Sequence, residues 1–514
     1  MTRYKNGMKL SVMIVLLITI LTKLVAFIKQ ILIASVFGAN TETDSFYLAY
    51  GFLTSLTYAF FSALSVTLVP IYQGINKKSK EDANVLIGRV MVCFVSISVF
   101  INIILLLNSR NISKILLIKS NMDYTRVAIY ISILSPMVIF GCVNSILGAV
   151  IEGNKVFIYS KSSGLVTSIW IILLTLLFKD QGVICLAYGI LLSSITQFII
   201  LIYGYRKYNI AKIKKPFWDK NVKSLCMLIC PLLLGNGIYE INKMIDKIIS
   251  SSFEAGSTSS LSYGQSLFDS FCALTITSTI AVFFTYISDY ASSNKDDSVL
   301  NSIDNCVAFL LLLVIPIEII VLANGESIVS IVYGHGAFDE ASVLRTAQII
   351  KGYAIGFPFL IFREIMAKTH YAYKDSKKPM QNSILAVFVN VIFSIILSKV
   401  IGIQGISIAT SISYFVCAIL MIISVKKHIS YSILKRTQFY LKIIISALLT
   451  SFINLLLFKQ SSANIGHLII LCVVTYVDFY GMLLLLRCKE IVDILPVIKN
   501  KFFVNKRGNK NETK

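Results

Sequence analysis

Charged residues are scarce in this chain. Asp, Glu, Lys and Arg make up 14% of its 514 residues, against about 25% in typical soluble domains. In contrast, 56% of the residues are hydrophobic and the mean hydropathy is +0.78. Apolar runs recur from one end to the other, which excludes a soluble globular protein and also soluble domains carried on one membrane anchor. We therefore predict an all-α polytopic membrane protein.

Acidic residues are the scarcer charged class. There are 26 Asp and Glu against 48 Lys and Arg, which gives a formal net charge of +22. In a soluble chain such an excess would suggest nucleic-acid binding. In a membrane protein it follows from the Lys and Arg that collect in cytoplasmic loops. We therefore expect a lipid bilayer around the chain and no nucleic-acid partner.

Motifs for covalent chemistry and for metal binding are missing from the sequence. The four histidines lie far apart, and the ten cysteines are scattered without a CxxC pair, so neither a metal site nor a disulfide framework is predicted. There is no nucleotide-binding loop and no nucleophile with a positioned base. We expect no catalytic residue, no cofactor and no metal. An enzyme embedded in the membrane is the less favoured alternative.

The apolar runs are long enough to cross a bilayer about fourteen times, since one crossing needs about 20 residues. The first two form a helical hairpin at 10–37 and 44–72, around the turn GANTET. The N-terminal run is too long for a signal peptide and lacks a small-residue cleavage site, so we expect it to be a mature span. The other spans are expected at 83–108, 124–151, 158–178, 182–205, 220–250, 259–290, 299–323, 341–373, 380–400, 403–425, 439–458 and 464–488.

Basic residues gather in alternate loops. They cluster near the N-terminus, in the C-terminal tail and in the loops at 77–80, 206–223, 377–378 and 426–436. The intervening loops hold almost none; these are GANTET, KDQG, SSFEAGSTSS and KQSSAN. The excess of Lys and Arg on one side predicts that both termini are cytoplasmic.

The first six spans resemble the next six. SPMVIFGCVNSILGAVIEGNK matches GFPFLIFREIMAKTHYAYKDSK, with Pro136 and Lys155 each repeated 222 residues later. FGANTETDSFY likewise parallels FEAGSTSSLSY. Because six is even, the two copies have the same orientation, and such repeats pack as two lobes with a substrate path between them. We predict an N-lobe at 1–205, a basic linker at 206–223, a C-lobe at 224–425, an added helix pair at 426–490 and a basic tail at 491–514.

Charges in the first hairpin indicate a polar chamber. Lys23 and Lys29 lie in the first span and Asp44 opens the second. A charge at the centre of a bilayer costs about 3 kcal/mol or more, so it normally faces a wet cavity or a partner. Two cations in one span suggest contact with an anionic, phosphate-bearing group. The alternative is that one of them reaches the interface or pairs with Asp44.

The seventh span carries a polar stripe. It consists of Asn236, Glu240, Lys243 and Lys247, at i, i+4, i+3, i+4 spacing on one helix face, with Asp246 beside it. The sequence allows two alternatives for these side chains: they line a cavity, or they form ion pairs inside the protein.

Two later spans hold further candidates. Asp269, in the eighth span, and Glu318 could line the cavity. In the tenth span Arg363 is the best candidate for a buried functional cation, whereas Lys368 is expected near the cytoplasmic end. Arg363 and Glu364 are adjacent on the chain, so we expect that they do not face each other.

Over nearly its whole length the chain resembles the MurJ (MviN) family of lipid II flippases, within the superfamily of multidrug and polysaccharide exporters. The resemblance lies in KQILIASVFGANTETDSFYLAY, SPMVIFGCVNSILGAVIEGN and YGHGAFDEASVLRTAQIIKGYAIGFPFLIFREIMAKTHYAYKDSKKPMQNS. It implies fourteen spans, arranged as two six-helix lobes and an extra helix pair with a groove for a lipid tail. It also implies the transport of a polyprenyl-pyrophosphate-linked glycan from the inner to the outer leaflet of the bacterial cytoplasmic membrane, for peptidoglycan synthesis and cell shape, with the cell-wall synthesis machinery as a possible partner.

The resemblance assigns roles to residues of this sequence. Lys23, Lys29, Arg363 and Lys243 would contact the pyrophosphate, and Asp44, Glu240 and Asp269 are candidates for ion coupling or gating. The expected mechanism is alternating access driven by the membrane potential or a monovalent cation.

The cavity charges depart from the family pattern. Lysines replace arginines at Lys23 and Lys29, Thr57 and Ser62 stand where charged residues are usual, and Gln265 and Ser266 replace an Asp-Arg pair. The alternatives are therefore a flippase for another polyprenyl-linked glycan, of teichoic acid, capsule or O-unit type, a small-solute or drug exporter, and a non-transporting scaffold for envelope synthesis.

Overall fold

The computed structural model describes residues 2–117, 122–206, 218–457, 464–488 and 490. Side chains are described for these residues except 2–17, 59, 220–221, 230–232, 234–236 and 239. Within these ranges the chain is helical and contains no strand. The predicted linker, the tail and the polar side chain of Asn236 fall mostly or entirely outside the described residues.

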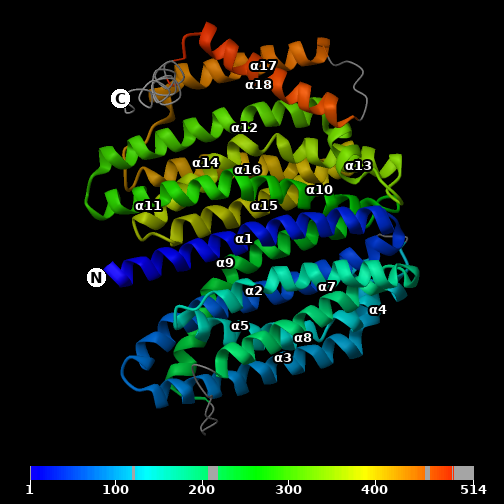
Figure 1. Cartoon of the computed structure of the whole chain (residues 1–514), viewed down its shortest axis with the longest axis vertical. Coiled ribbons are helices and arrows are strands. Elements are labelled where there is room, and N and C mark those ends of the chain that lie inside the picture. The colour runs from blue at the N-terminus through cyan, green and yellow to red at the C-terminus, as the bar shows by residue number, and fades with distance from the viewer. Residues whose placement is uncertain (1, 118–121, 207–217, 458–463, 489, 491–514) are drawn as a thin grey trace, which may run out of the picture. The chain divides into compact units, whose positions relative to one another are not determined.

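The helices follow the hydrophobic runs closely (Figure 1). The first half of the chain contains α1 (Thr2–Phe37), α2 (Thr41–Asn76), α3 (Lys80–Leu116), α4 (Tyr124–Leu134), α5 (Met137–Gly153), α6 (Ile158–Lys161), α7 (Ser163–Phe178), η1 (Lys179–Gln181), α8 (Ile184–Arg206) and α9 (Lys220–Ser250). The second half contains α10 (Ser257–Cys272), η2 (Ala273–Thr277), α11 (Ser278–Ser292), α12 (Asp296–Tyr333), α13 (Glu340–Ala354), α14 (Phe357–Ala372), α15 (Lys377–Ile401), α16 (Gln404–Val425), η3 (Ile433–Arg436), α17 (Thr437–Leu457) and α18 (Ile465–Leu485).

Twelve candidate membrane spans are found among the described residues, so the all-helical membrane fold is confirmed and the count of fourteen is not. Two predicted spans are absent from the twelve, α9 and the pair α13–α14. Both are helical, but α9 carries the stripe that ends at Lys247, and α14 has three charges between Arg363 and Lys368. These charged residues lower the mean hydropathy of α9 and of α13–α14, so neither is counted as a candidate span.

The chain forms two compact units. Unit 1 comprises residues 1–270, 332–349 and 383–409, and unit 2 comprises residues 271–331, 350–382 and 410–514. The chain first passes from one unit to the other at Ser270–Phe271, just before the π-helical turn η2. The predicted division into an N-lobe, a linker, a C-lobe, a helix pair and a tail remains a prediction.

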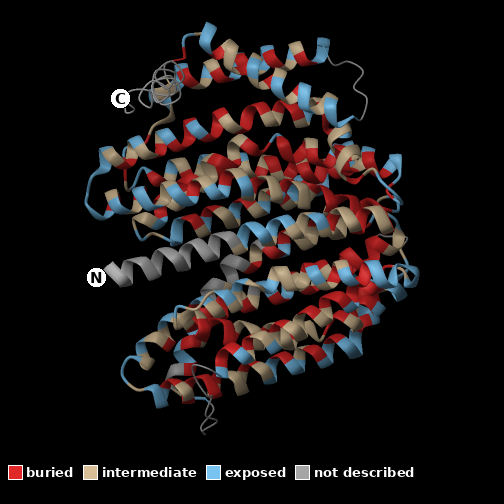
Figure 2. Cartoon of the chain, viewed as in Figure 1, coloured by how far each residue is buried: buried red, intermediate tan, exposed pale blue. Residues whose placement is uncertain are grey.

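Helix α2 is central to unit 1. It packs most extensively against α9 and α5, and it also contacts α3 and α4. Helix α3 shows how the sequence builds such contacts, because its buried residues Leu86, Val90 and Phe94 recur every four positions. Figure 2 shows α3 with buried residues along one side and exposed residues along the other.

In unit 2, α18 is attached to α12 and α17. Tyr476 and Tyr480 donate hydrogen bonds from their hydroxyl groups to the Leu313 and Leu312 carbonyls of α12, at 3.0 and 3.3 Å. Between α17 and α18, Asn454 Nδ2 donates to Thr475 Oγ1 at 2.9 Å, and both residues are buried. These polar contacts fix the register of helices whose other faces are apolar and exposed.

Candidate functional site

The turn between α1 and α2 is closed by a capping box. The Asn40 side chain accepts hydrogen bonds from the backbone N–H groups of Glu42 and Thr43, and Thr43 Oγ1 accepts from the Asn40 N–H. This arrangement satisfies the free N–H groups of the first turn of α2. It also places two carboxylates, Glu42 and Asp44, at the positive end of the helix dipole.

Both carboxylates join α2 to other helices of unit 1. Glu42 Oε1 accepts from the Val183 N–H at 3.1 Å and from the Tyr130 hydroxyl at 3.3 Å. Asp44 is buried. Its Oδ2 accepts from the Gly256 N–H at 2.7 Å, and its Oδ1 accepts from the N–H and hydroxyl of Ser259 at 2.7 and 2.6 Å. Asp44 therefore caps α10 and is not paired with a lysine of α1 within the described residues.

Three glycines bring main chains together around Asp44. Gly38, Gly256 and Gly336 have φ of +66°, +88° and +65°. A Cβ on Gly38 would lie 2.2 Å from the Ala337 carbonyl oxygen, one on Gly256 would lie 2.4 Å from that of Ala39, and one on Gly336 would lie 2.1 Å from that of Ser35. Only glycine fits these positions. We call this region, residues 35–44, 255–263 and 333–345 of unit 1, the hairpin junction.

An aromatic cluster lies within the hairpin junction and extends from it to Tyr47. The ring of Tyr263 packs against those of Tyr47, Tyr333 and Phe338, with centroids 5.4 to 5.5 Å apart. The hydroxyl of Tyr263 donates to the Gly38 carbonyl at 3.0 Å, and Gln30 Nε2 donates to the Tyr47 hydroxyl at 2.9 Å. Apolar burial and directed hydrogen bonds thus hold the same end of α1, α2 and α10.

The lysines of α1 lie farther along that helix. Lys23 is exposed and Lys29 is half-buried. Within the described part of the chain, neither ammonium group forms an ion pair within 4.0 Å. The predicted alternative, a pair between one of them and Asp44, is therefore not formed in this structure.

Helix α9 brings its stripe to this region of unit 1. Lys243 Nζ lies 3.8 Å from Glu240 Oε1, and Glu240 is buried. The carboxylate of Asp269 on α10 interacts electrostatically with Lys243 and Lys23. The structure therefore brings together four predicted site residues, Lys23, Glu240, Lys243 and Asp269, as a mixed cluster in which cations from α1 and α9 face the same acid.

Lys247 packs against α2, apart from the cluster around Asp269. Its Nζ donates to the Tyr47 carbonyl at 3.3 Å and lies 6.0 Å from the centroid of the Tyr47 ring. A Cβ on Gly51 would lie 2.7 Å from this Nζ, so the missing side chain at Gly51 makes room for the lysine. The i+4 spacing of Lys247 from Lys243 was a sequence signal for this position.

Asp246 is a buried acid whose partners the sequence did not reveal. Its Oδ1 accepts from Ser394 Oγ at 3.0 Å, and Ser394 Oγ lies 3.3 Å from Asn390 Oδ1, both on α15. No ion pair of Asp246 is found among the described residues. The side-chain oxygen atoms of Asp246, Ser394 and Asn390 therefore lie together and carry one negative charge. A usable signal was present, because Asn390 and Ser394 are polar residues four apart in the otherwise apolar stretch 384–397.

Arg363 belongs to unit 2. Its Nη1 lies 3.4 Å from Glu364 Oε1, and its guanidinium stands 5.4 Å from the centroid of the Tyr414 ring. The expectation that adjacent Arg363 and Glu364 would not face each other is wrong, because two long side chains can bend toward one another from neighbouring positions. Glu318 is half-buried on α12, and Lys368 stands over the Phe284 and Tyr371 rings.

Positions that depart from the charged pattern are occupied by small or uncharged polar side chains. Thr57 is buried and donates to the Leu53 carbonyl of its own helix at 2.8 Å. Ser62, Gln265 and Ser266 are half-buried. The cations described above are therefore carried by α1 and α9 in unit 1, and by α14 in unit 2.

Known proteins resemble this chain over most of its length. The family model described as "Lipid II flippase MurJ" matches residues 33–475. A probable lipid II flippase MurJ of Rickettsia prowazekii is 25% identical over 445 residues, covering 83% of this chain and 85% of the relative. The Thermotoga maritima protein of the same description is 23% identical over 494 residues, covering 93% of this chain and 96% of the relative.

Solved structures share the fold. A structure described as lipid II flippase MurJ in an inward closed conformation has a TM-score of 0.80 at 22% identity, and covers 91% of this chain and 98% of its own. An inward-facing multidrug resistance transporter of the MATE family has a TM-score of 0.68 at 14% identity, covering 81% and 96%. At these identities the two likenesses establish the fold alone.

Proposed function

The chain belongs to the MurJ family of lipid II flippases, which are transporters and not enzymes, and on that premise we propose that it moves lipid II from the inner to the outer leaflet of the bacterial cytoplasmic membrane. The substrate is a polyprenyl pyrophosphate that carries a glycan. Its headgroup must cross the apolar layer while its tail stays in lipid. At the outer surface the glycan becomes available to the cell-wall synthesis machinery.

The observation that carries this proposal is the placement of cations in unit 1. Lys23 and Lys29 on α1 form no ion pair within the described ranges, and Lys243 shares Asp269 with Lys23. Unpaired positive charge within a membrane helix is costly, so it is retained where an anion binds. A pyrophosphate supplies that anion. Arg363 of unit 2 is a further candidate, although its ion pair with Glu364 already compensates part of its charge.

Transport proceeds by alternating access between the predicted N-lobe and C-lobe, with both termini in the cytoplasm. The loops at 38–43 and 251–260 belong to the side poor in basic residues, which is the outer side by the charge rule. The hairpin junction then lies at the outer end of unit 1 and keeps that end closed. Outward opening requires that the junction separate and later reform.

Coupling to a monovalent cation uses Asp246. Its buried carboxylate, with Ser394 and Asn390 beside it, offers several oxygen ligands and one negative charge, and such hard oxygen ligands suit an alkali cation. The other coupling candidates suit this role less well. Asp44 is already saturated by three hydrogen bonds, Glu240 lies beside Lys243, and Asp269 faces two lysines.

A second substrate class is favoured by one observation, the lysines in place of arginines. An ammonium group binds phosphate as a point charge, without the bidentate fork of a guanidinium. Such a site suits any polyprenyl-linked glycan with a phosphate at the same place, including teichoic acid or capsule units. An open pocket of about 540 Å³ on α18 would place mainly apolar side chains beside a prenyl tail in either case; it is lined by Val477, Asp478, Gly481, Met482, Leu484 and Leu485.

The test measures lipid II at the outer surface of intact cells that are depleted of this protein. Outer-leaflet lipid II is labelled or digested, and the internal pool is measured in the same cells. We expect exposure to fall and the internal pool to grow. A copy carrying Lys23→Ala and Lys29→Ala should fail to rescue exposure, whereas Lys23→Arg with Lys29→Arg should rescue it.

The matched control changes two exposed lysines elsewhere, Lys295→Ala and Lys399→Ala, and should rescue exposure fully. If lipid II exposure stays normal while another envelope glycan leaves the surface, the substrate is that glycan. If the Lys23→Ala/Lys29→Ala copy restores exposure as well as the wild type, the cationic site is wrong and a scaffold role is favoured.

A further inference from the structure

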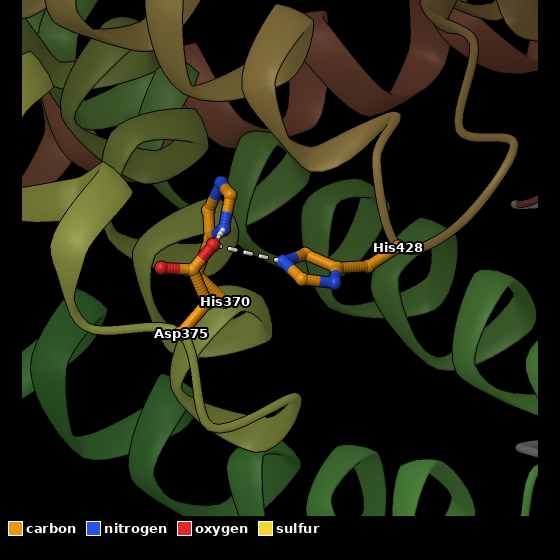
Figure 3. Close-up of side chains that lie close together, drawn as sticks. All are labelled: His370, Asp375 and His428. Carbon is orange, nitrogen blue, oxygen red and sulfur yellow. Dashed lines mark hydrogen bonds and ion pairs between the residues drawn. The ribbon is translucent and has the colours of Figure 1, made fainter.

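Three residues of unit 2 that are far apart in the sequence meet at one point. His370 is in the last turn of α14, Asp375 is in the turn before α15, and His428 follows α16. One ligand atom from each lies within 4.8 Å of the other two. Figure 3 shows both imidazole rings directed at the same Asp375 oxygen. None of the roles discussed above uses these side chains.

The two oxygens of Asp375 have different partners. Oδ1 accepts from the backbone N–H groups of Lys377 and Lys378, both at 3.1 Å, and so caps α15. Oδ2 faces His428 Nε2 at 3.1 Å and His370 Nδ1 at 3.6 Å. The carboxylate is thus held rigidly by one oxygen while the other remains directed at the two rings.

His370 is fully buried, and its tautomer depends on which way the Ser424 hydroxyl donates. Its Nε2 lies 2.9 Å from Ser424 Oγ. Ser424 Oγ also lies 3.1 Å from the Met421 carbonyl oxygen, and it accepts a hydrogen bond from Asn382 Nδ2. When the Ser424 hydroxyl donates to Met421, Ser424 accepts from His370 Nε2, and the neutral ring then has its lone pair on Nδ1.

In this tautomer the lone pair of His370 Nδ1 points toward the lone pairs of Asp375 Oδ2. Nδ1 is buried and forms no hydrogen bond among the described residues, and at 3.6 Å the two atoms are too far apart for one. A buried acceptor that faces an anionic acceptor lacks a positive group between them. This buried nitrogen, which has no hydrogen bond and lies 3.6 Å from an anionic oxygen, is the observation that points to a ligand.

His428 completes the arrangement from the other side. Its ring stacks on Tyr373, with centroids 5.2 Å apart and an interplanar angle of 14°, and it meets the His370 ring edge to face at 5.3 Å. The Tyr373 hydroxyl donates to Asp296 at 2.6 Å, which fixes the stacking surface. The His428 ring is therefore held in the orientation that directs Nε2 at Asp375.

We propose that His370 Nδ1, Asp375 Oδ2 and His428 Nε2 bind a divalent transition-metal ion, with Zn²⁺ as the best match. Zinc takes nitrogen and carboxylate ligands at about 2.0 to 2.2 Å in a tetrahedron, so ligand atoms around it lie about 3.3 Å apart. The two carboxylate-to-nitrogen distances, 3.1 and 3.6 Å, lie on either side of that value. Water would occupy the fourth position.

Bonds from Ser424 and from the backbone of α15 orient the ligands, as outer partners do in metal sites. A bound ion would connect the α14–α15 turn to the segment between α16 and α17. By the charge rule these loops are cytoplasmic, so the site would sample the metal of the cytoplasm. The metal would act within unit 2 on the connections between its helices.

The test uses full-length protein purified in detergent with an affinity tag that contains no histidine. After treatment with EDTA and its removal, Zn²⁺ is titrated in competition with a chromogenic chelator, and bound metal is counted by atomic emission. We expect one zinc per chain. Asp375→Asn and His428→Ala should each weaken zinc binding tenfold or more. In Asp375→Asn the amide oxygen of the new side chain can still cap α15, so folding is preserved.

The matched control is His335→Ala, which removes an exposed histidine of unit 1 and should bind zinc like the wild type. Co²⁺ in place of Zn²⁺ should give the intense visible absorption of a tetrahedral complex in the wild type and the control only. The proposal is overturned if no zinc remains bound against a chelator of micromolar affinity, or if Asp375→Asn and His428→Ala bind zinc as tightly as the wild type. Neither readout depends on transport.

Discussion

Asp44 Oδ1 accepts hydrogen bonds from both the backbone N–H and the hydroxyl of Ser259, which lies 215 residues later in the chain. The Asp44 carboxylate thus takes the position of an N-cap for a helix to which it does not belong. A charged acceptor in such a position strengthens each hydrogen bond. The beginning of α2 and the beginning of α10 are held together by this one side chain.

Replacing Asp44 should therefore weaken unit 1 strongly. Asp44→Ala leaves the N–H groups of Gly256 and Ser259 without their acceptor, and hydrogen bonds to charged groups contribute about 1.5–3 kcal/mol each. We expect a loss of about 3 kcal/mol and a clear fall in the apparent Tm of the detergent-purified protein. Asp44→Asn should lie between Asp44→Ala and the wild type.

The control for charge removal is Asp180→Asn, at an exposed position of η1. It should leave the apparent Tm within about 1 °C of the wild type, because exposed charges contribute little. Equal effects of Asp44→Ala and Asp180→Asn would contradict the capping role.

Gly51→Ala should displace the Lys247 side chain without lowering the stability of the fold. The new methyl group would lie within 3 Å of Nζ and Cδ of Lys247, and this flexible side chain can move aside at small cost. The ammonium then leaves the Tyr47 carbonyl. We expect little change in apparent Tm but a several-fold fall in lipid II exposure.

Gly74→Ala on the same helix provides the comparison. Nothing lies within 4 Å of a Cβ at this position. Alanine is favoured over glycine in helices by up to about 1 kcal/mol. Gly74→Ala should therefore leave both the apparent Tm and the exposure of lipid II unchanged. An equal loss of lipid II exposure in Gly51→Ala and Gly74→Ala would show that the position of Lys247 does not affect transport.

Gly336→Ala should cost more than positive φ alone explains. Gly336 and Gly402 have nearly the same φ, +65° and +68°, but only a Cβ on Gly336 would collide with a carbonyl oxygen, at 2.1 Å. Placing alanine in the left-handed region costs about 1–2 kcal/mol. We expect a loss of that order for Gly402→Ala and a larger one for Gly336→Ala, by the fall in apparent Tm. Equal losses would mean that the hairpin junction relaxes freely.

Asp246→Asn should remove the response of transport to monovalent cations. In proteoliposomes we expect the wild type to transport faster with one alkali cation than with choline, and Asp246→Asn to transport equally slowly with both. Asp289→Asn, at an exposed acid of α11, should behave like the wild type. A wild type that responds to membrane potential but not to the cation would exclude this role for Asp246.

The arrangement of spans could be predicted well because hydrophobicity sets it. Helix α9 runs from Lys220 to Ser250, the limits expected from the sequence, and the break between α4 and α5 comes at Pro136. Hydropathy acts locally, so each run could be placed without knowledge of the others. Mean hydropathy does not support the count of fourteen, because clusters of charged residues interrupt the apolar runs of α9 and α14.

The partners of individual side chains could not be predicted in the same way. Asp246 with Ser394, Asp44 with Ser259, and His370 with His428 are pairs from distant helices, and their meeting depends on how those helices pack. The four histidines appeared unrelated for this reason. Local spacing was also misleading once, for Arg363 and Glu364, because chain neighbours with long side chains can still pair.

The three glycines of the hairpin junction mean that its loops approach as nearly as two polypeptide backbones can. The spacing is set by the thickness of the main chain and not by the shapes of side chains. A relative could therefore change almost every other residue of these loops and still close in the same way. If it carried a larger residue at the positions of Gly38, Gly256 or Gly336, its loops would have to lie farther apart, and this end of unit 1 would need other contacts to hold its helices together.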